Sequence, residues 1–491
     1  MRCLFFILFL SALSISHAQQ KTTLEEGFMS PPDSIRTGTF WYWISDNISK
    51  EGAIADLHAM KKAGINLAFI GNIGPSYHSS SNHPYGKVKF MSEEWWQVMH
   101  AALKTATELD IEIGIFNSPG WSQSGGPWVK PEQSMRYLAS SELVVRGPKK
   151  ISEKIPAPAH DFQDVKVLAF KARRDNLFDR GSVSFSSNIK GFVDYQYALP
   201  AGAESHITLT LPQAETVRGI LIHPAYYLHT QCLLQVRDGN EYKTIKEFPA
   251  SRDATIDPQR GFDQLAPIVE SLPETTGSQF RLVFKNTKEN SIISSITLTT
   301  APVVHRYPAK TFAKPENSTA APASFPDPSL FVAPEQVSDI SAHLAADGTL
   351  NWDVPEGDWV ILRTGMTPTG VKNSPAPPQA TGLETDKLSK EHIHAHFDAF
   401  LGEIHKRIPE ADRKCWKYTV LDSYEKGGQN ITDNFLELFK LHYGYDPTPF
   451  LPTYYGYPVG SYEISDRFLW DMRRFVADRI ACEYVAGLRE K

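Results

Sequence analysis

Hydrophobic residues in the first part of the chain alternate between short apolar runs and amphipathic helical stretches. The runs at Thr39–Ile44, Ile65–Ile73 and Ile111–Phe116 predict buried strands. The stretches Lys50–Lys62 and Glu93–Asp110 have the helical period, and each follows a serine that can cap a helix. Strands and helices that alternate at this spacing predict βαβ units and a parallel sheet.

From about Ser140 to Val360 the period changes to two, and helical patterns nearly vanish. His206–Leu211 alternates polar and apolar residues, as a half-buried antiparallel strand does. Similar short runs follow at Val217–Ile222, Leu233–Val236, Phe280–Phe284 and Ile293–Leu298. The pattern predicts an inserted all-β sandwich domain over residues 140–357, with Pro-rich connections.

After the insertion the α/β pattern returns. Asp358–Met366 and Lys417–Asp422 read as buried strands, and helical patterns cover Ser389–Ile408, Thr432–Tyr443 and Glu463–Lys491. We therefore expect one α/β domain of the (β/α)₈-barrel type, formed by residues 19–139 and 358–491 and interrupted by the sandwich.

The charge balance and the one long apolar run restrict the partners of the chain. Its 491 residues carry a net charge of −6, so there is no basic excess to neutralise a nucleic-acid backbone. Arg2, the apolar run Leu4–Leu13 and the small residues before Gln19 predict a signal peptide over residues 1–18 and export to the periplasm or beyond. The alternative is a membrane anchor, but the run is short for a span of about 20 residues.

Cysteine spacing adds little. Cys232, Cys415 and Cys482 are widely separated, which is neither a disulfide framework nor a zinc-ligand pattern. We expect buried, unreactive thiols.

Polar and aromatic residues gather where the predicted strands end, which is where α/β folds carry their sites. Carboxylates, amides and indole faces together suit a carbohydrate, which needs hydroxyl contacts and an apolar platform. Trp43 and Trp121 are equally open to a role in the core, and Trp95 and Trp96 are expected in the core. The candidate contacts at strand ends are Trp43, Asn72, Asn117, Trp121, Asp422 and Tyr424.

Glu425 is the strongest candidate for chemistry. It follows a predicted strand directly, and burial against Tyr424 would raise the pKa of its carboxyl group, as a general acid of glycoside hydrolysis requires. The alternative is an ion pair with Lys426 or Arg363. Glycoside hydrolysis usually needs a second carboxylate. Asp422, Glu384 and Asp386 are possible partners, but the last two fit ligand binding or metal coordination equally well.

His392 and His396 form a competing signal, because residues four apart share a helix face that can bind zinc. The HExxH pattern is absent and no third ligand is evident, so we expect solvated histidines. A histidine-metal hydrolase stays an alternative.

With these residues placed, the chain resembles glycoside hydrolase family 106, the α-L-rhamnosidases. The resemblance rests on strings that span nearly the whole chain: Ser30–Pro32, Trp41–Trp43, Ser49–Leu57, Phe90–Trp96, Asn117–Trp128, Gly382–Lys387 and Asp422–Glu425. It implies a barrel with an inserted β-sandwich, a calcium ion near the sugar, and inverting hydrolysis of terminal α-L-rhamnose from pectic or similar glycans.

The resemblance also bears on individual residues. Glu425 matches the position of the family's general acid, and the general base is left unassigned. The calcium ligands are unassigned too, although a hard cation prefers oxygens such as those of Glu384, Asp386 and Asn117.

A closed barrel needs eight parallel strands, and the sequence offers five. We expect the chain to be the N-terminal part of a longer enzyme, with little activity when made alone. An open five-stranded sheet that is complete as it stands is the alternative. In function, the alternative is a carbohydrate-binding protein without turnover on the same scaffold.

Overall fold

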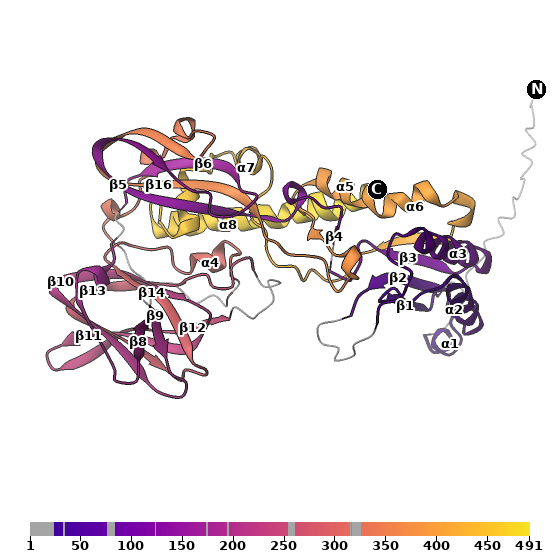
Figure 1. Ribbon diagram of the computed structural model, residues 1–491, viewed down its shortest axis with the longest axis horizontal. Coiled ribbons are helices and arrows are strands. Elements are labelled where there is room, and N and C mark those ends of the chain that lie inside the picture. The colour runs from indigo at the N-terminus through magenta and orange to yellow at the C-terminus, as the bar shows by residue number, and fades with distance from the viewer. Residues whose placement is uncertain are drawn as a thin grey trace, which may run out of the picture.

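The structure is a computed structural model, and it describes residues 24–32, 35–75, 84–122, 124–172, 175–193, 196–253, 261–314, 316 and 326–491. The predicted signal peptide lies outside the described residues. The described chain is a mixed α/β fold with a parallel sheet at one end and two antiparallel sheets at the other (Figure 1).

The predicted parallel sheet is present at the right of Figure 1. Its strands pair in the order β1-β2-β3-β18, all parallel. They are β1 (Gly38–Ile44), β2 (Leu67–Ile73), β3 (Glu112–Phe116) and β18 (Trp416–Val420). Helices α2 (Lys50–Lys62) and α3 (Glu93–Leu109) connect the first three strands. The predicted serine caps are confirmed: Ser49 Oγ accepts from the Gly52 amide at 3.0 Å, and Ser92 Oγ from the Trp95 amide at 3.2 Å.

The two faces of this sheet differ. Trp41 and Trp43 point toward the helices and are buried in a core that includes Trp95. The opposite face carries an aromatic cluster of Phe40, Tyr42, Phe69 and Phe116, whose paired ring centroids lie 5.3 to 6.1 Å apart. Phe40 is 59% exposed, so part of this cluster faces solvent.

The strand predicted at Lys417–Asp422 is present as β18, but it is not buried. Among the described residues it pairs with β3 alone at the edge of the sheet, and three of its residues are exposed.

Eight strands of the inserted segment form one curled antiparallel sheet around its own core (lower left of Figure 1). The central strands β10 (Ser205–Pro224) and β13 (Ile268–Lys285) are long, and register shifts interrupt their pairing. The other strands are β7 (Ser182–Phe185), β8 (Lys190–Val193), β9 (Gln196–Leu199), β11 (Tyr227–Asp238), β12 (Glu241–Asp253) and β14 (Ser291–Thr299). The predicted predominance of strands is present, and among the described residues these eight strands pair as one sheet without a division into two stacked sheets.

A second antiparallel sheet has the order β15-β6-β16-β5. Its strands are β5 (Arg136–Lys154), β6 (Gln163–Phe170), β15 (Ser338–Asp339) and β16 (Thr349–Pro368). Asp358–Met366 is a strand as predicted, but it is part of β16 and runs antiparallel to β5 and β6. It is therefore not a fifth strand of the parallel sheet, and the expected domain boundary at residue 358 falls inside one continuous strand.

Helices cover the second sheet and join it to the parallel one. Alternate residues of β16, such as Val360 and Leu362, pack on α7 and α8. The predicted helix Ser389–Ile408 is broken at Phe400, and the predicted C-terminal helix contains a π-helical turn over Ile480–Val485. The remaining helices are α1 (Leu24–Met29), α4 (Tyr307–Lys310), α5 (Lys390–Ala399), α6 (Leu401–Arg407), α7 (Phe435–Tyr443), α8 (Tyr462–Arg479) and α9 (Ala486–Glu490).

Among the described residues, no helix is both long and apolar enough to cross a membrane.

One segment crosses the carboxyl ends of the parallel strands, and we call residues 371–386 the return segment. It contains β17 (Leu383–Glu384), which pairs with β4 (Gly125–Gly126). The backbone approaches closely here: a Cβ on Gly74 would lie 2.4 Å from the Ala376 carbonyl oxygen, so only glycine fits. Because of this packing, the polar residues of the return segment lie against those that follow β3.

Cys232 and Cys415 are buried, and burial raises the pKa of the Cys415 thiol to about 11. Cys482 is exposed, so the prediction of buried thiols is wrong at that position.

Candidate active site

The loop that follows β18 carries exposed acidic residues, and we call Asp422–Lys426 the strand-end loop. Asp422, Tyr424 and Glu425 are all exposed. The Glu425 carboxylate accepts a hydrogen bond from Ser423 Oγ at 2.8 Å. The prediction that Glu425 is buried against Tyr424 is therefore wrong, since a loop beyond an edge strand has few neighbours to cover it.

The expected alternative partners of Glu425 have other contacts. Arg363 holds Asp164 with two bonds of 2.7 and 2.8 Å. Lys426 is buried, and its Nζ donates to Ser374 Oγ on the return segment.

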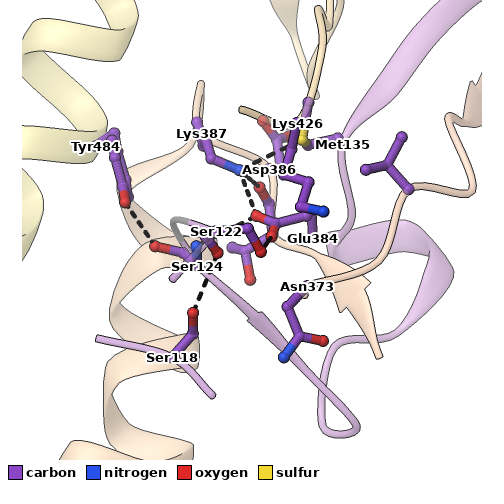
Figure 2. A network of polar contacts seen from close by, with 12 residues as sticks. Ser118, Ser122, Ser124, Met135, Asn373, Glu384, Asp386, Lys387, Lys426 and Tyr484 are labelled. Carbon is purple, nitrogen blue, oxygen red and sulfur yellow. Dashed lines mark hydrogen bonds and ion pairs between the residues drawn. The ribbon is translucent and has the colours of Figure 1, made fainter. Parts of the chain in front are cut away.

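Glu384 is the centre of a buried polar network, which Figure 2 shows from close by. Its carboxylate accepts from Ser122 Oγ at 3.0 Å, from the Ser124 amide at 3.2 Å and from Lys387 Nζ at 2.8 Å. Glu384 and Lys387 are both fully buried. A buried carboxylate is stable only with a cation and hydrogen-bond donors around it, and this one has both.

Tyrosines lie around Lys387. Its Nζ is 5.6 Å from the ring centroid of Tyr424 and 5.9 Å from that of Tyr484, which suits cation–π contacts. The Tyr484 hydroxyl accepts a hydrogen bond from Ser124 Oγ at 2.8 Å. Burial, together with the nearby charge of Glu384, raises the pKa of the Tyr484 phenol above the usual range, so this phenol stays protonated.

Asp386 forms a second buried site beside the first. Its carboxylate accepts from Arg136 at 3.1 Å, from Gln429 at 2.7 Å and from Thr432. Burial opposes its ionisation, but His392, whose Nδ1 lies 3.5 Å away, and the Arg136 guanidinium outweigh burial and hold the pKa of Asp386 below its usual value. At 3.5 Å the His392 contact is long, whereas Arg136 and Thr432 contact the carboxylate directly.

These contacts test whether Glu384, Asp386 and Asn117 fit a calcium ion. A calcium ion needs six to eight free oxygen ligands. Both carboxylates already neutralise a buried cation, which leaves the set without a free carboxylate. Within the described ranges, no group of three or more acidic, histidine or cysteine residues could hold a metal. This donor set therefore does not fit calcium.

The other predicted contacts divide between the core and the site. Trp43 packs against Trp41 and Trp95 with ring centroids 5.6 and 6.0 Å away, which favours the core interpretation. Asn72 Oδ1 accepts from Trp95 Nε1 at 3.0 Å and faces the helices. Trp121 is half-buried, 6.0 Å from the Tyr42 ring, and it extends the aromatic cluster toward the strand ends.

The histidines are not the solvated pair that we expected. His396 is buried: its Nδ1 accepts from Trp128 Nε1 at 3.1 Å, and its Nε2 donates to the Asn117 carbonyl at 3.0 Å. Burial lowers the pKa of His396 to about 4, so the ring is neutral at physiological pH. Both ring nitrogens are engaged, which removes His396 as a zinc ligand.

Sequence reasoning missed the cations of the two buried sites. Lys387 lies three residues after Glu384 in a string that was already singled out, so the spacing was a usable signal. Arg136 lies 250 positions from Asp386 in sequence, and nothing local marks it.

The comparisons with known proteins find relatives that are described as glycosidases. The family model of the alpha-L-rhamnosidases, numbered 106 among the glycoside hydrolases, matches residues 29–491. A Formosa agariphila protein described as "Putative beta-glucuronidase" is 28% identical over 490 residues, which is 99% of this chain and 31% of that protein. The solved structure of a rhamnosidase from Novosphingobium sp. PP1Y matches with a TM-score of 0.77 at 27% identity, covering 96% of this chain and 46% of that one. The chain thus spans under half the length of either relative.

Proposed function

This chain belongs to glycoside hydrolase family 106, and from that premise we propose that the protein hydrolyses terminal α-L-rhamnose from pectic or similar glycans with inversion. Glu425 is the general acid of the proposed reaction. The observation that carries this role is its position: it is an exposed carboxyl group one loop beyond the carboxyl end of a parallel strand.

In the proposed step, Glu425 donates its proton to the glycosidic oxygen while the bond from that oxygen to the anomeric carbon breaks. A general base takes a proton from a water molecule as that water attacks the anomeric carbon from the opposite face, which inverts its configuration. Exchange of protons with solvent afterwards restores the protonated Glu425 and the free base. We assign Tyr42 and Trp121 as an aromatic platform for the sugar, since their rings lie 6.0 Å apart on the sheet face beside the strand ends. Glu384 and Asp386 are engaged with Lys387 and Arg136, so neither is assigned as the base.

Glu425→Gln in the full-length protein tests the acid role. On a natural rhamnoside with a poor leaving group, we expect a loss of ~10²–10⁴-fold in kcat/KM. An activated aryl rhamnoside needs little protonation, so its loss should be much smaller. Glu241→Gln, at an exposed site in the curled sheet, is the matched control. Equal losses on both substrates would contradict the acid role, and sugar binding without turnover by the unaltered protein would favour the binding-protein alternative.

The name of the Formosa relative raises a second substrate class, a β-glucuronide. Such a sugar carries a carboxylate, for which an enzyme normally supplies a cation. Lys387 and Arg136 are already matched by Glu384 and Asp386, which favours a neutral sugar. Parallel assays with aryl α-L-rhamnoside and aryl β-glucuronide decide between the two classes.

Calcium and export complete the proposal. The proposed site includes a calcium ion near the sugar, bound by ligands other than Glu384, Asp386 and Asn117. Removal of calcium with a chelator, followed by measurement of activity as calcium is added back, tests this part of the proposal.

Export predicts that the mature protein begins at or near Gln19. An intact Met1 on exported material would contradict it.

A further inference from the structure

The two residues that flank Glu425 are both connected to the same buried carboxylate. On one side, Lys426 Nζ donates to Ser374 Oγ. The Ser374 amide in turn donates to Ser122 Oγ at 2.7 Å, and Ser122 Oγ donates to Glu384 Oε1 at 3.0 Å. This arm of the network therefore ends on Glu384.

The other arm reaches the same carboxylate from the opposite neighbour. Tyr424 precedes Glu425, and its ring centroid lies 5.6 Å from Lys387 Nζ. Lys387 donates to Glu384 Oε2 at 2.8 Å. Each oxygen of Glu384 thus holds one arm, and Glu425 lies between the two anchored residues.

The centre of this arrangement is well fixed. Glu384, Lys387, Ser122 and Ser124 are buried, and the carboxylate has three donors around it (Figure 2). Electrostatic contacts are stronger where water is excluded, so the position of the carboxylate is closely determined. Glu425 itself has no such support, because its side chain is exposed and accepts a hydrogen bond from Ser423 in the same loop.

We propose that Glu384 is the positioning residue of the general acid: by anchoring Tyr424 through Lys387 and Lys426 through two serines, it sets where the Glu425 carboxyl group meets the substrate. The inference rests on the proposed function and deepens it. A general acid must come within hydrogen-bond reach of the leaving oxygen, and a misplacement of about 1 Å can cost ~10²-fold in rate.

Two variants test the arms with different severity. Glu384→Gln removes the central charge, and Ser122→Ala removes the hydroxyl that joins Ser374 to Glu384. If Glu384 positions the acid, each variant should lose more kcat/KM on the poor leaving group than on the activated one, as Glu425→Gln does. Both losses should be smaller than those of Glu425→Gln. We expect a loss of ~10–10²-fold for Glu384→Gln on the poor leaving group and a clearly smaller loss on the activated one.

Combination with Glu425→Gln separates positioning from stability. Once the acid is gone, its placement no longer matters, so Glu384→Gln should add little to the loss caused by Glu425→Gln. If the Glu384 carboxylate serves only stability, Glu384→Gln should lower kcat/KM equally on both substrates. Its loss should then multiply with the loss caused by Glu425→Gln in the double variant. Either of those results would overturn the proposal.

A matched control and a second readout keep the test independent of folding. Glu270 is a fully buried carboxylate paired with Arg306 at 2.7 Å in the curled sheet, so Glu270→Gln should lower stability and leave the ratio between the two substrates unchanged. If Glu384→Gln does not fold, Glu384→Gln/Lys387→Met removes both charges together. Hydrogen exchange of residues 422–427 should be faster in Ser122→Ala, and unchanged exchange would contradict the anchoring.

The two proposals fail in different ways. If Glu425→Gln shows no dependence on the leaving group, the general-acid role is wrong whatever the Glu384 variants do. If Glu425→Gln behaves as expected while Glu384→Gln affects both substrates equally, the acid stands and the positioning role falls.

Discussion

The acidic residues of the return segment and those of the strand-end loop are alike in sequence and opposite in structure. Glu384 and Asp386 are fully buried, and each is matched to a cation, Lys387 or Arg136. Asp422 and Glu425 are exposed beyond the last residue of β18. Because Glu384 and Asp386 are buried and paired, they stabilise the fold. Because Asp422 and Glu425 are exposed, they can contact a substrate. The residue type alone does not decide which task a carboxylate performs.

The largest effect is expected when a buried carboxylate loses the cation that it is paired with. Arg136→Met removes the partner of Asp386, and we expect a loss of about 3–5 kcal/mol in the free energy of unfolding, because an unpaired buried charge is costly. Urea denaturation measures it. Asp433→Asn is the control, since Asp433 contacts the same arginine but is about half exposed. A loss as small as that of the control would show that Asp386 does not depend on Arg136.

The next effect concerns His396, whose backbone contact supports Asn117 beside the Glu384 network. Its pKa is about 4 in the folded protein, against about 6.5 when unfolded. The unfolded chain therefore gains a proton first as pH falls, so the stability due to neutral His396 is complete above about pH 6.5 and declines toward pH 4. The free energy of unfolding should fall by up to about 3 kcal/mol over this range, since one pKa unit corresponds to about 1.4 kcal/mol.

His396→Gln can keep both hydrogen bonds without a group that titrates in this range. Urea unfolding between pH 4 and 7 should show a flatter dependence than the unaltered protein. An identical slope in both proteins would mean that His396 does not contribute.

A weaker effect is expected at lower pH from Asp386. Its folded pKa lies below the usual value of about 3.9, so its contribution to stability is present above about pH 4 and lost as pH falls through the folded value. Asp386→Asn should remove that part of the acid dependence, while Asp422→Asn should leave it unchanged. Unfolding curves from pH 5 downward make the comparison.

Much of the local structure could be predicted, because it depends on neighbours in sequence. The Ser49 and Ser92 caps and the βαβ order follow from short patterns, and the structure has them. Asp358–Met366 shows the limit: an apolar run predicts a strand, but its partners and direction depend on residues about 200 positions away. Similarly, the apolar residues of β18 could not reveal that it is an edge strand.

The site was predictable only in part for the same reason. Acidic residues at strand ends were found because strand ends are recognisable in sequence. Their environments were not, since the burial of Lys387 and the contact of Arg136 with Asp386 exist only after segments far apart in sequence have packed together. The expectation for His396 failed on the same ground: a helical pattern does not tell which face Trp128 and Asn117 will cover.

The smallest expected effect is the change in the free energy of unfolding caused by Glu425→Gln. A value close to zero there would separate Glu425 most clearly from the buried carboxylates. Glu425 is exposed and bonded to a serine two residues away, so Glu425→Gln should change the free energy of unfolding by no more than about 0.5 kcal/mol. Glu384→Gln leaves Lys387 buried without its carboxylate and should cost several times more. Urea unfolding of the two variants, set beside their rates, separates a residue that acts on the substrate from one that acts through the fold. A large destabilisation by Glu425→Gln would place that carboxylate with Glu384 and Asp386, and the division between the two regions would fail.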